Sequence, residues 1–323
     1  MTRPARPFLW WIGALLAGVA VHGAAWFWLT SRLRDGAEAA VAFYGTQGWH
    51  ASAGAPRRGG WPLAASLWYP RVTVTGPASW TAEWVDLRIA LLRPGTLEIV
   101  PGGRQTFGVP GWPEVSGEAG RLVIATPLDG DGAADVAGAD ITLMLPAGPV
   151  LVYGISGRLG EADAALDLTG IQLPESWRLL EGNAERAGFR AVLVPSAPLG
   201  GTPAQRAARW RDSGGVLSVP GFEVRWGTFS VTGTGTLRLN ARLQPEAEAR
   251  LQVTGYAAML DGAVRTGLLP PRSAAAAKTV LGLLGAPGGG TVDVPLVLQA
   301  GVLSVARFPL LRVPDLDWAG RYR

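Results

Sequence analysis

The segment that decides the fold is LRLNARLQPEAEARLQV, residues 237–253. Apolar residues occupy every second position before Pro245-Glu246 and again after it, and most of the intervening positions are polar or charged. Successive side chains of a strand point to opposite faces, so a two-residue period predicts a strand with one buried face. The segment therefore predicts an antiparallel hairpin with its turn at Pro245-Glu246 and with Arg242 facing Glu248 across it.

The same alternation recurs along the chain, for example between residues 85 and 91. We expect further strands at residues 68–75, 96–100, 120–126, 139–145, 150–158, 164–173, 188–194, 222–232, 291–299 and 302–308. Many short strands joined by Gly and Pro turns are typical of an antiparallel sheet system. The sequence therefore predicts a mainly β protein with one large, curved antiparallel sheet.

Helical patterns interrupt the strands only locally. Thr202 is a candidate N-cap with Pro203 at the first helical position, which predicts a short helix over residues 202–211. Two more short helices are expected at residues 256–269 and 273–284, divided by two prolines. Their apolar faces are expected to pack against the sheet.

The N-terminal segment Phe8–Leu29 contains no Asp, Glu, Lys or Arg. An α-helix rises about 1.5 Å per residue, so this stretch is long enough to cross a hydrocarbon core of about 30 Å. Trp10 and Trp11 lie near one end and Trp26 and Trp28 near the other, where aromatic rings settle at the two headgroup levels. The segment predicts a single transmembrane anchor.

A cleaved signal peptide is the alternative, because Gly23 and Ala25 are small residues of the kind that precede a cleavage site. The apolar run continues past them, which favours the anchor. His22 lies inside the span with no evident partner, and we expect it to be merely tolerated. The expected organisation is a tail at 1–7, the anchor at 8–29, a helical extension at 30–48 and a β-rich domain at 49–323.

Composition excludes several classes of protein. The chain has 323 residues, of which 48% are hydrophobic and 17% charged, and it has no cysteine. Disulfides, thiolate nucleophiles and Cys-ligated zinc are therefore excluded. The net charge of +4 comes from dispersed arginines, with Lys278 as the single lysine. Nucleic-acid binding requires basic residues gathered on one face, so we expect no nucleic-acid partner.

The search for chemical sites gives no catalytic, metal or cofactor residues. A Ser-His-acid triad would need His50, and the serine motifs at residues 50–54 and 154–157 are interpreted as a loop and a turn. The aspartates at 129, 131, 135 and 140 do not have the spacing of a calcium loop and are interpreted as a solvated turn. We therefore expect no cofactor and no enzymatic activity.

Three segments carry a resemblance to a known family. They are RGGWPL at residues 58–63, GTGTLRLNARLQPEAEARLQVTGYAAML at 233–260 and VDVPLVLQAGVLSVARFPL at 292–310. In this order, after an N-terminal anchor, they resemble the bacterial family named domain of unknown function 2125. The resemblance implies a location and a body plan but no catalytic residues. More distantly, the ending is similar to AsmA-like envelope proteins, which implies a curved sheet able to hold lipid.

The function expected from these features is that of a non-enzymatic, single-pass protein of the bacterial inner membrane. Its N-terminus is expected in the cytoplasm and its bulk in the periplasm, where the curved sheet binds lipid or another apolar ligand. The candidate groove residues are Trp68, Trp84, Leu237, Leu239, Leu251 and Val253. Two alternatives remain open: an envelope scaffold with a filled core that binds another envelope protein, and a membrane-tethered hydrolase.

Overall fold

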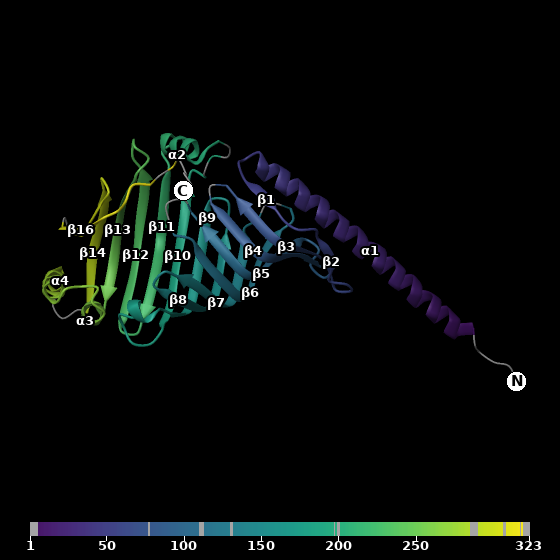
Figure 1. The fold of residues 1–323 in the computed structure, drawn as a ribbon, viewed down its shortest axis with the longest axis horizontal. Coiled ribbons are helices and arrows are strands. Elements are labelled where there is room, and N and C mark those ends of the chain that lie inside the picture. Colours follow the sequence, from purple (N-terminus) through teal and green to yellow (C-terminus); the bar gives the residue numbers. More distant parts are fainter. Residues whose placement is uncertain are drawn as a thin grey trace.

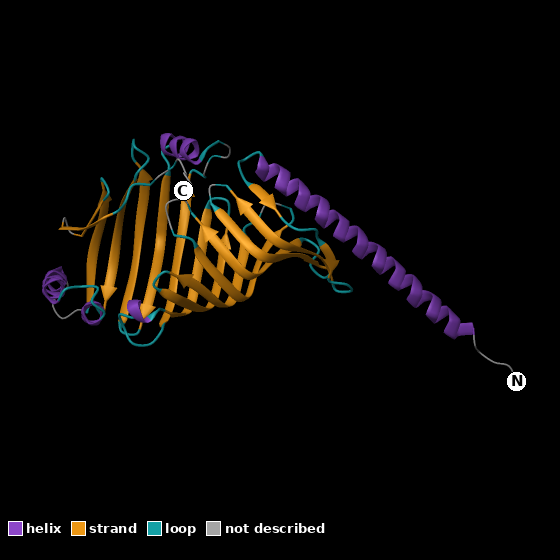
Figure 2. Cartoon of the chain, in the orientation of Figure 1, coloured by secondary structure: helices purple, strands orange, loops and turns teal. Residues whose placement is uncertain are grey.

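The computed structural model describes residues 6–76, 78–109, 113–129, 132–196, 198, 201–284, 290–305, 308–316 and 318. Helix α1 (Arg6–Gly45) is followed by a single antiparallel sheet, and three further α-helices lie at the ends of strands (Figure 1, Figure 2). The α1 segment is long and apolar enough to span a membrane, a property that a membrane anchor shares with a signal sequence. The mainly β fold class is confirmed.

The sheet is a meander in which nearly every strand pairs with its neighbours in the sequence. Its order is β1-β3-β4 and then consecutively to β16, while β2 pairs with β3 at the same edge as β1. The strands are β1 (His50–Ser52), β2 (Arg57–Gly59), β3 (Ala64–Thr75), β4 (Ser79–Ala90), β5 (Thr96–Gly108), β6 (Val115–Pro127), β7 (Ala134–Leu145), β8 (Gly148–Leu159), β9 (Asp163–Gln172), β10 (Ala184–Val194), β11 (Val216–Trp226), β12 (Phe229–Leu239), β13 (Pro245–Thr254), β14 (Thr291–Gln299), β15 (Val302–Val305) and β16 (Phe308–Arg312). The strands beside α1 run obliquely to those near β12, as the accumulated twist of a long sheet requires (Figure 1).

The short helices match the sequence patterns. In α2 (Pro203–Asp212), Thr202 and Gln205 form a reciprocal capping box, which satisfies backbone N–H groups at the helix start. Helices α3 (Tyr256–Arg265) and α4 (Pro271–Leu284) follow β13, and the 3-10 turn η1 (Glu175–Trp177) follows β9. Met259 of α3 packs against the core cluster around Val152, Leu180 and Trp226.

The hairpin of residues 237–253 has a different turn from the predicted one. Leu239 pairs with Pro245 and Leu237 with Ala247, so the loop is residues 240–244 and Pro245 belongs to β13. The Asn240 side chain closes this loop because its Oδ1 accepts hydrogen bonds from the backbone N–H groups of Arg242 and Gln244.

The predicted charge pair across this hairpin is therefore also wrong. Arg242 lies in the loop, Glu248 faces Thr236, and Arg238 is the residue opposite Glu246. The local turn chemistry of Asn240 decides the register.

Three further predictions need correction. Residues 222–232 do not form one strand, because the chain turns at Gly227-Thr228 between β11 and β12. Residues 302–308 are divided between β15 and β16. The serine motifs predicted as a loop and a turn both lie largely in strands, in β1 for 50–52 and in β8 for 154–157.

Candidate functional site

One face of the sheet carries a continuous row of apolar residues. Cross-strand pairing joins one residue from each of twelve strands, from β3 to β14, and every member is apolar or glycine. The members are Leu67, Leu87, Ile99, Ile124, Val136, Gly157, Leu166, Phe189, Phe222, Gly233, Leu251 and Val294.

A second row lies beside the first on the same face. Side chains two residues apart on a strand point to the same face, so the residues two positions from the first row lie on the same face as that row. They form a row of paired residues from β6 to β14. Its members are Leu122, Gly138, Ile155, Leu168, Ala187, Val224, Val231, Val253 and Val292. We call the face of the sheet that carries these two rows the apolar face.

The apolar face is only partly covered. The main helix contacts are of α1 with β1 and β3, of α2 and α3 with β12, and of α4 with β14. Figure 2 shows α1 at one end of the sheet and α3 and α4 at the other. Most members of the first row are half-buried, and Phe189 in the middle keeps 43% of its surface exposed. A solvent-accessible apolar band therefore crosses the middle of the sheet.

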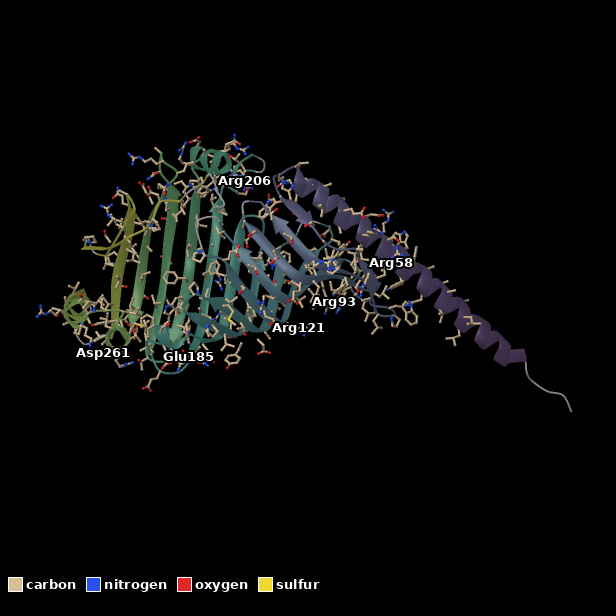
Figure 3. All side chains as sticks on the ribbon, viewed as in Figure 1. Arg58, Arg93, Arg121, Glu185, Arg206 and Asp261 are labelled. Atoms are coloured by element: carbon tan, nitrogen blue, oxygen red, sulfur yellow. The ribbon has the colours of Figure 1, made fainter. Side chains whose placement is uncertain are left out.

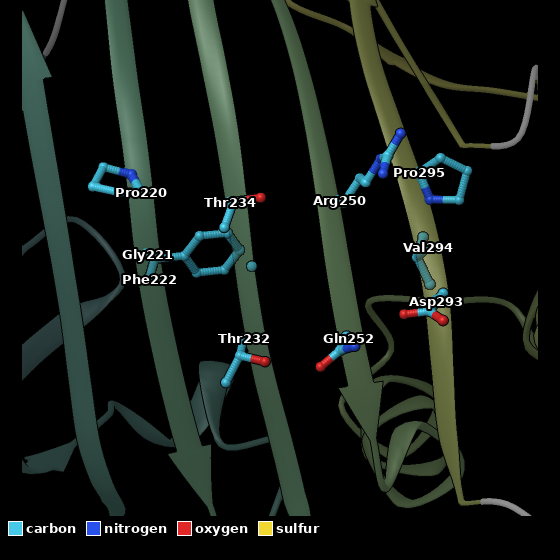
Figure 4. Close-up of a pocket in the computed structure, with 11 residues that line it drawn as sticks. Pro220, Gly221, Phe222, Thr232, Thr234, Arg250, Gln252, Asp293, Val294 and Pro295 are labelled. Atoms are coloured by element: carbon cyan, nitrogen blue, oxygen red, sulfur yellow. The ribbon is translucent and has the colours of Figure 1, made fainter.

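The opposite face is more polar, above all in strands β8–β14. The row between the two apolar rows includes Ser156, Asp167 and Glu223, and Asp167 forms an ion pair with Arg186 that raises the pKa of the arginine. Strands β11–β14 also form a shallow depression of about 780 Å³, lined by polar residues that include Arg250 and Asp293 and also by Phe222, Gly233 and Val294 of the first apolar row (Figure 4). The depression is open and holds few ionisable groups, so it offers little for acid-base chemistry.

Helix α1 packs against the first strands of the sheet. Leu33 is buried against Leu67 and Ile89, and Tyr69 is partly buried in the same cluster. Burial raises the pKa of Tyr69, and the nearby Arg34 partly opposes this. The first apolar row thus begins at Leu67, directly beside α1.

The same helix is hydrogen-bonded to the sheet nearer its N-terminus. The indole N–H of Trp26 donates to the carbonyl oxygens of Gly59 and Ala64, at 3.2 and 3.0 Å. The Nε2 of His22 lies 2.7 Å from the Pro62 carbonyl oxygen, which only accepts, so Nε2 is the donor. The expectation that His22 has no partner is wrong.

The predicted groove residues fall on two faces. Leu237, Leu239, Leu251 and Val253 occupy alternate positions of β12 and β13 and lie on the apolar face. Trp68 and Trp84 alternate with Leu67 and Leu87 and lie on the opposite face. There the Arg57 guanidinium lies over the Trp68 ring, and the Trp84 ring covers Gly102.

The predicted headgroup tryptophans all belong to α1. Trp28 is exposed and lies under the Arg32 guanidinium, whereas Trp26 faces the sheet. Trp10 and Trp11 are in α1, but their side chains lie outside the described part of the structure.

The chemical candidates do not assemble into a site. His50 is exposed in β1, and Asp135 and Asp140 lie in β7, while Asp131 lies outside the described residues. Within the described ranges no group of three or more His, Asp or Glu residues is placed to hold a metal ion. Sequence reasoning missed the cross-strand rows and the docking of α1, because neither is a local pattern.

Comparison with known families gives one match. The family described as an uncharacterized protein conserved in bacteria, domain of unknown function 2125, matches residues 26–314, which is most of the chain. No curated protein and no solved structure matches the chain. The distant similarity to AsmA-like proteins stays a prediction.

Proposed function

We propose, from the premise that the chain belongs to this bacterial family of uncharacterized proteins, that it is a non-enzymatic membrane-anchored protein which binds lipid acyl chains along its apolar face. We place the anchor in the inner membrane, with the short N-terminus in the cytoplasm and the sheet in the periplasm. The family description carries no activity, so the proposal rests on the geometry of the chain itself.

The observation that supports it is the first apolar row. Leu67 and Val294 at its two ends are buried, so the accessible part of the row runs from β4 to β13. Neighbouring strands lie about 4.8 Å apart, and nine spacings give a band about 43 Å long. One leaflet contributes about half of a 30 Å hydrocarbon core, so the band has room for about three acyl chains end to end. Acyl chains gain from burying area and need no directional bonds, which suits a band without polar side chains.

The orientation of α1 is part of the proposal: the segment before the span lies in the cytoplasm and the large domain after it in the periplasm. Arg3 and Arg6 before the span are balanced by Arg32 and Arg34 after it, so positive charge does not decide the orientation.

The test is photo-crosslinking of the full chain in vesicles that contain a phospholipid with a diazirine on its acyl chain. We expect crosslinked peptides from α1, which contacts annular lipid, and also from strands β8–β13. Crosslinks confined to α1 would exclude acyl-chain binding by the sheet. A scaffold with a protein partner on this face would give that result.

A matched pair of variants connects the signal to the apolar face. Phe189→Glu and Ser156→Glu each add one negative charge at an exposed position in the middle of the sheet, but on opposite faces. We expect Phe189→Glu to lower crosslinking of the strands and to leave crosslinking of α1 unchanged. Ser156→Glu is expected to match the wild type. The proposal would be contradicted if both variants had the melting temperature of the wild type and lost strand crosslinking to the same extent.

A further inference from the structure

The β2–β3 connection beside α1 is linked by backbone hydrogen bonds to two further connections of the sheet. The backbone N–H of Leu91 donates to the Leu63 carbonyl oxygen at 3.0 Å, which joins the β2–β3 loop to the β4–β5 turn. The N–H of Leu128, just after β6, donates to the Gly95 carbonyl oxygen at 2.9 Å. We call residues 60–63, 91–95 and 128 the loop cluster.

The loop cluster exposes large apolar side chains. Trp61 is 55% exposed, Leu63 76%, Leu92 94% and Leu128 49%. Single exposed apolar residues are ordinary on a protein surface, but four on adjoining connections form a patch of the kind that marks a contact.

The hydrogen bonds of α1 fix the height of this patch along the helix. Arg58 donates to Ser31, Trp26 donates to Gly59, and His22 donates to Pro62, so the β2–β3 connection runs toward the N-terminus of α1. The Trp61 ring packs edge-on against His22. His22 lies seven residues before Leu29, the end of the uncharged segment, which is about 10 Å along the axis.

The β2–β3 loop and the uncharged segment therefore lie at the same level along α1, and the Leu91–Leu63 hydrogen bond joins the β4–β5 turn to this loop. If residues 8–29 fill the hydrocarbon core, the tip of the β2–β3 loop lies about 10 Å inside its boundary, near the depth that amphipathic elements reach. If the bilayer instead ended at His22, a span of about 20 residues would draw Arg3 and Arg6 into the hydrocarbon, which is costly.

The charges around the patch fit a lipid surface. Residues 55–63 and 91–95 contain Arg57, Arg58 and Arg93 and no acidic residue, whereas the third connection places the exposed Asp129 directly after Leu128. All three arginines are exposed, and Figure 3 shows Arg58 and Arg93 on the part of the sheet nearest α1. The Arg58 guanidinium lies 4.3 Å from the centre of the Phe27 ring, at the last turn of the span. Arginines at this height are placed to meet anionic lipid headgroups.

We propose that the loop cluster is a second membrane contact, in which Trp61, Leu63 and Leu92 enter the same leaflet that α1 leaves. The domain then contacts the bilayer through two elements, α1 and the loop cluster, instead of through α1 alone. This inference rests on the membrane span of α1 in the proposed function, but it is independent of lipid binding by the apolar face.

The natural absence of cysteine gives a direct test. The full chain in vesicles with anionic lipid is labelled with an environment-sensitive fluorophore at Leu63→Cys or Leu92→Cys. The matched control is Leu268→Cys, 57% exposed in the turn after α3, and the reference is Leu16→Cys inside the span. Quenching is measured with lipid-borne nitroxides and with aqueous iodide.

We expect nitroxide lipids to quench the label at 63, 92 and 16, and iodide quenching at 63 and 92 to be about threefold or more below that at 268. Labels at 63 and 92 that behave like the label at 268 would overturn the inference. Shielding from both quenchers would also overturn it, because it would mean that protein covers the patch. A label at residue 16 that nitroxide lipids do not quench would refute the membrane span of α1. Lipid binding by the apolar face is tested separately, by the crosslinking experiment.

Discussion

Gly262 in α3 lies where the helix backs onto the loop that precedes β10. A Cβ added at this position would come within 3 Å of three backbone atoms of Leu179. A backbone cannot swing aside as the tip of a flexible side chain does, so Gly262→Ala must displace the helix or the loop. The contact closes the core cluster around Leu180 and Trp226, in which Met259 of the same helix takes part.

The sign of the effect follows from two opposing magnitudes. Replacing Gly by Ala inside a helix ordinarily stabilises by about 1 kcal/mol. Forcing extra volume into a packed site costs about 1–3 kcal/mol, occasionally more, and overlap with backbone belongs at the upper end. We expect a net loss of about 2 kcal/mol, which for a chain of this size lowers the melting temperature by about 3 °C.

Helix α4 supplies the matched control. At Gly282 the nearest atom to an added Cβ is the Tyr256 hydroxyl oxygen at 3.9 Å, so Gly282→Ala should gain about 1 kcal/mol and melt slightly higher. The assay is thermal unfolding of the full chain in one detergent, followed by tryptophan fluorescence. If the two variants shift the melting temperature in the same direction by similar amounts, α3 is not docked on Leu179 as described.

Two further outcomes test the junction between α1 and the sheet. Leu33→Ala should lower the free energy of unfolding by about 2–5 kcal/mol in chemical denaturation, because Leu33 is buried against Leu67. The control is Val41→Ala, at an exposed position of the same helix, which should change the free energy of unfolding by no more than about 0.5 kcal/mol. Equal effects of the two substitutions would mean that α1 does not pack against the sheet. Burial raises the pKa of Tyr69, so the folded state favours the neutral phenol over the phenolate. The resulting stabilisation of the fold is fully present below about pH 10, the ordinary pKa of tyrosine, and is lost as the pH rises through the raised pKa of Tyr69. Tyr69→Phe should flatten the decline in stability above about pH 10 and remove one late step from the ultraviolet titration, and an unchanged titration would contradict this.

The strands were predictable because alternation is a local property. The pairing of β12 with β13 followed from the residue types in 237–253, although the turn between them did not. Asn240 stabilises a five-residue loop through two hydrogen bonds from backbone N–H groups. The Pro-Glu dipeptide that attracted the turn prediction is instead the start of β13, where Pro245 faces Leu239. Competition between two turn-forming segments is decided by side-chain hydrogen bonds, which composition does not reveal.

The apolar rows were not predictable, because they depend on the register of every ladder between β3 and β14. A shift of one residue moves a whole strand's side chains to the other face. Irregular pairing interrupts several ladders, for example between Ile99 and Arg104 and between Val219 and Phe222. The chemical type of Trp68 and Trp84 matches that of the leucines in β12 and β13, but alternation from Leu67 and Leu87 places both tryptophans on the opposite face.

The docking of α1 was hidden for a different reason. Hydropathy describes residues 8–29 as a uniform span, but His22 and Trp26 bond to carbonyl oxygens 33 to 40 residues further along the chain. These bonds make one side of the last turns of the span a protein interface. The sequence identifies the apolar segment, and only the tertiary contacts show that the sheet reaches down beside it.

The two proposals meet at Leu67. The first apolar row begins at this residue, which packs against Leu33, only four residues or about 6 Å along the axis beyond Leu29. If the domain hung from a flexible stalk, an acyl chain would cross water before reaching the row, at a cost of about 0.8 kcal/mol for each exposed CH₂. With the loop cluster in the leaflet, the strands nearest α1 lie beside the hydrocarbon, so an acyl chain reaches the accessible part of the row, beyond the buried Leu67, with little of that exposure. Variants that unseat the loop cluster without altering the row should therefore reduce lipid crosslinking of the strands, starting with those nearest α1.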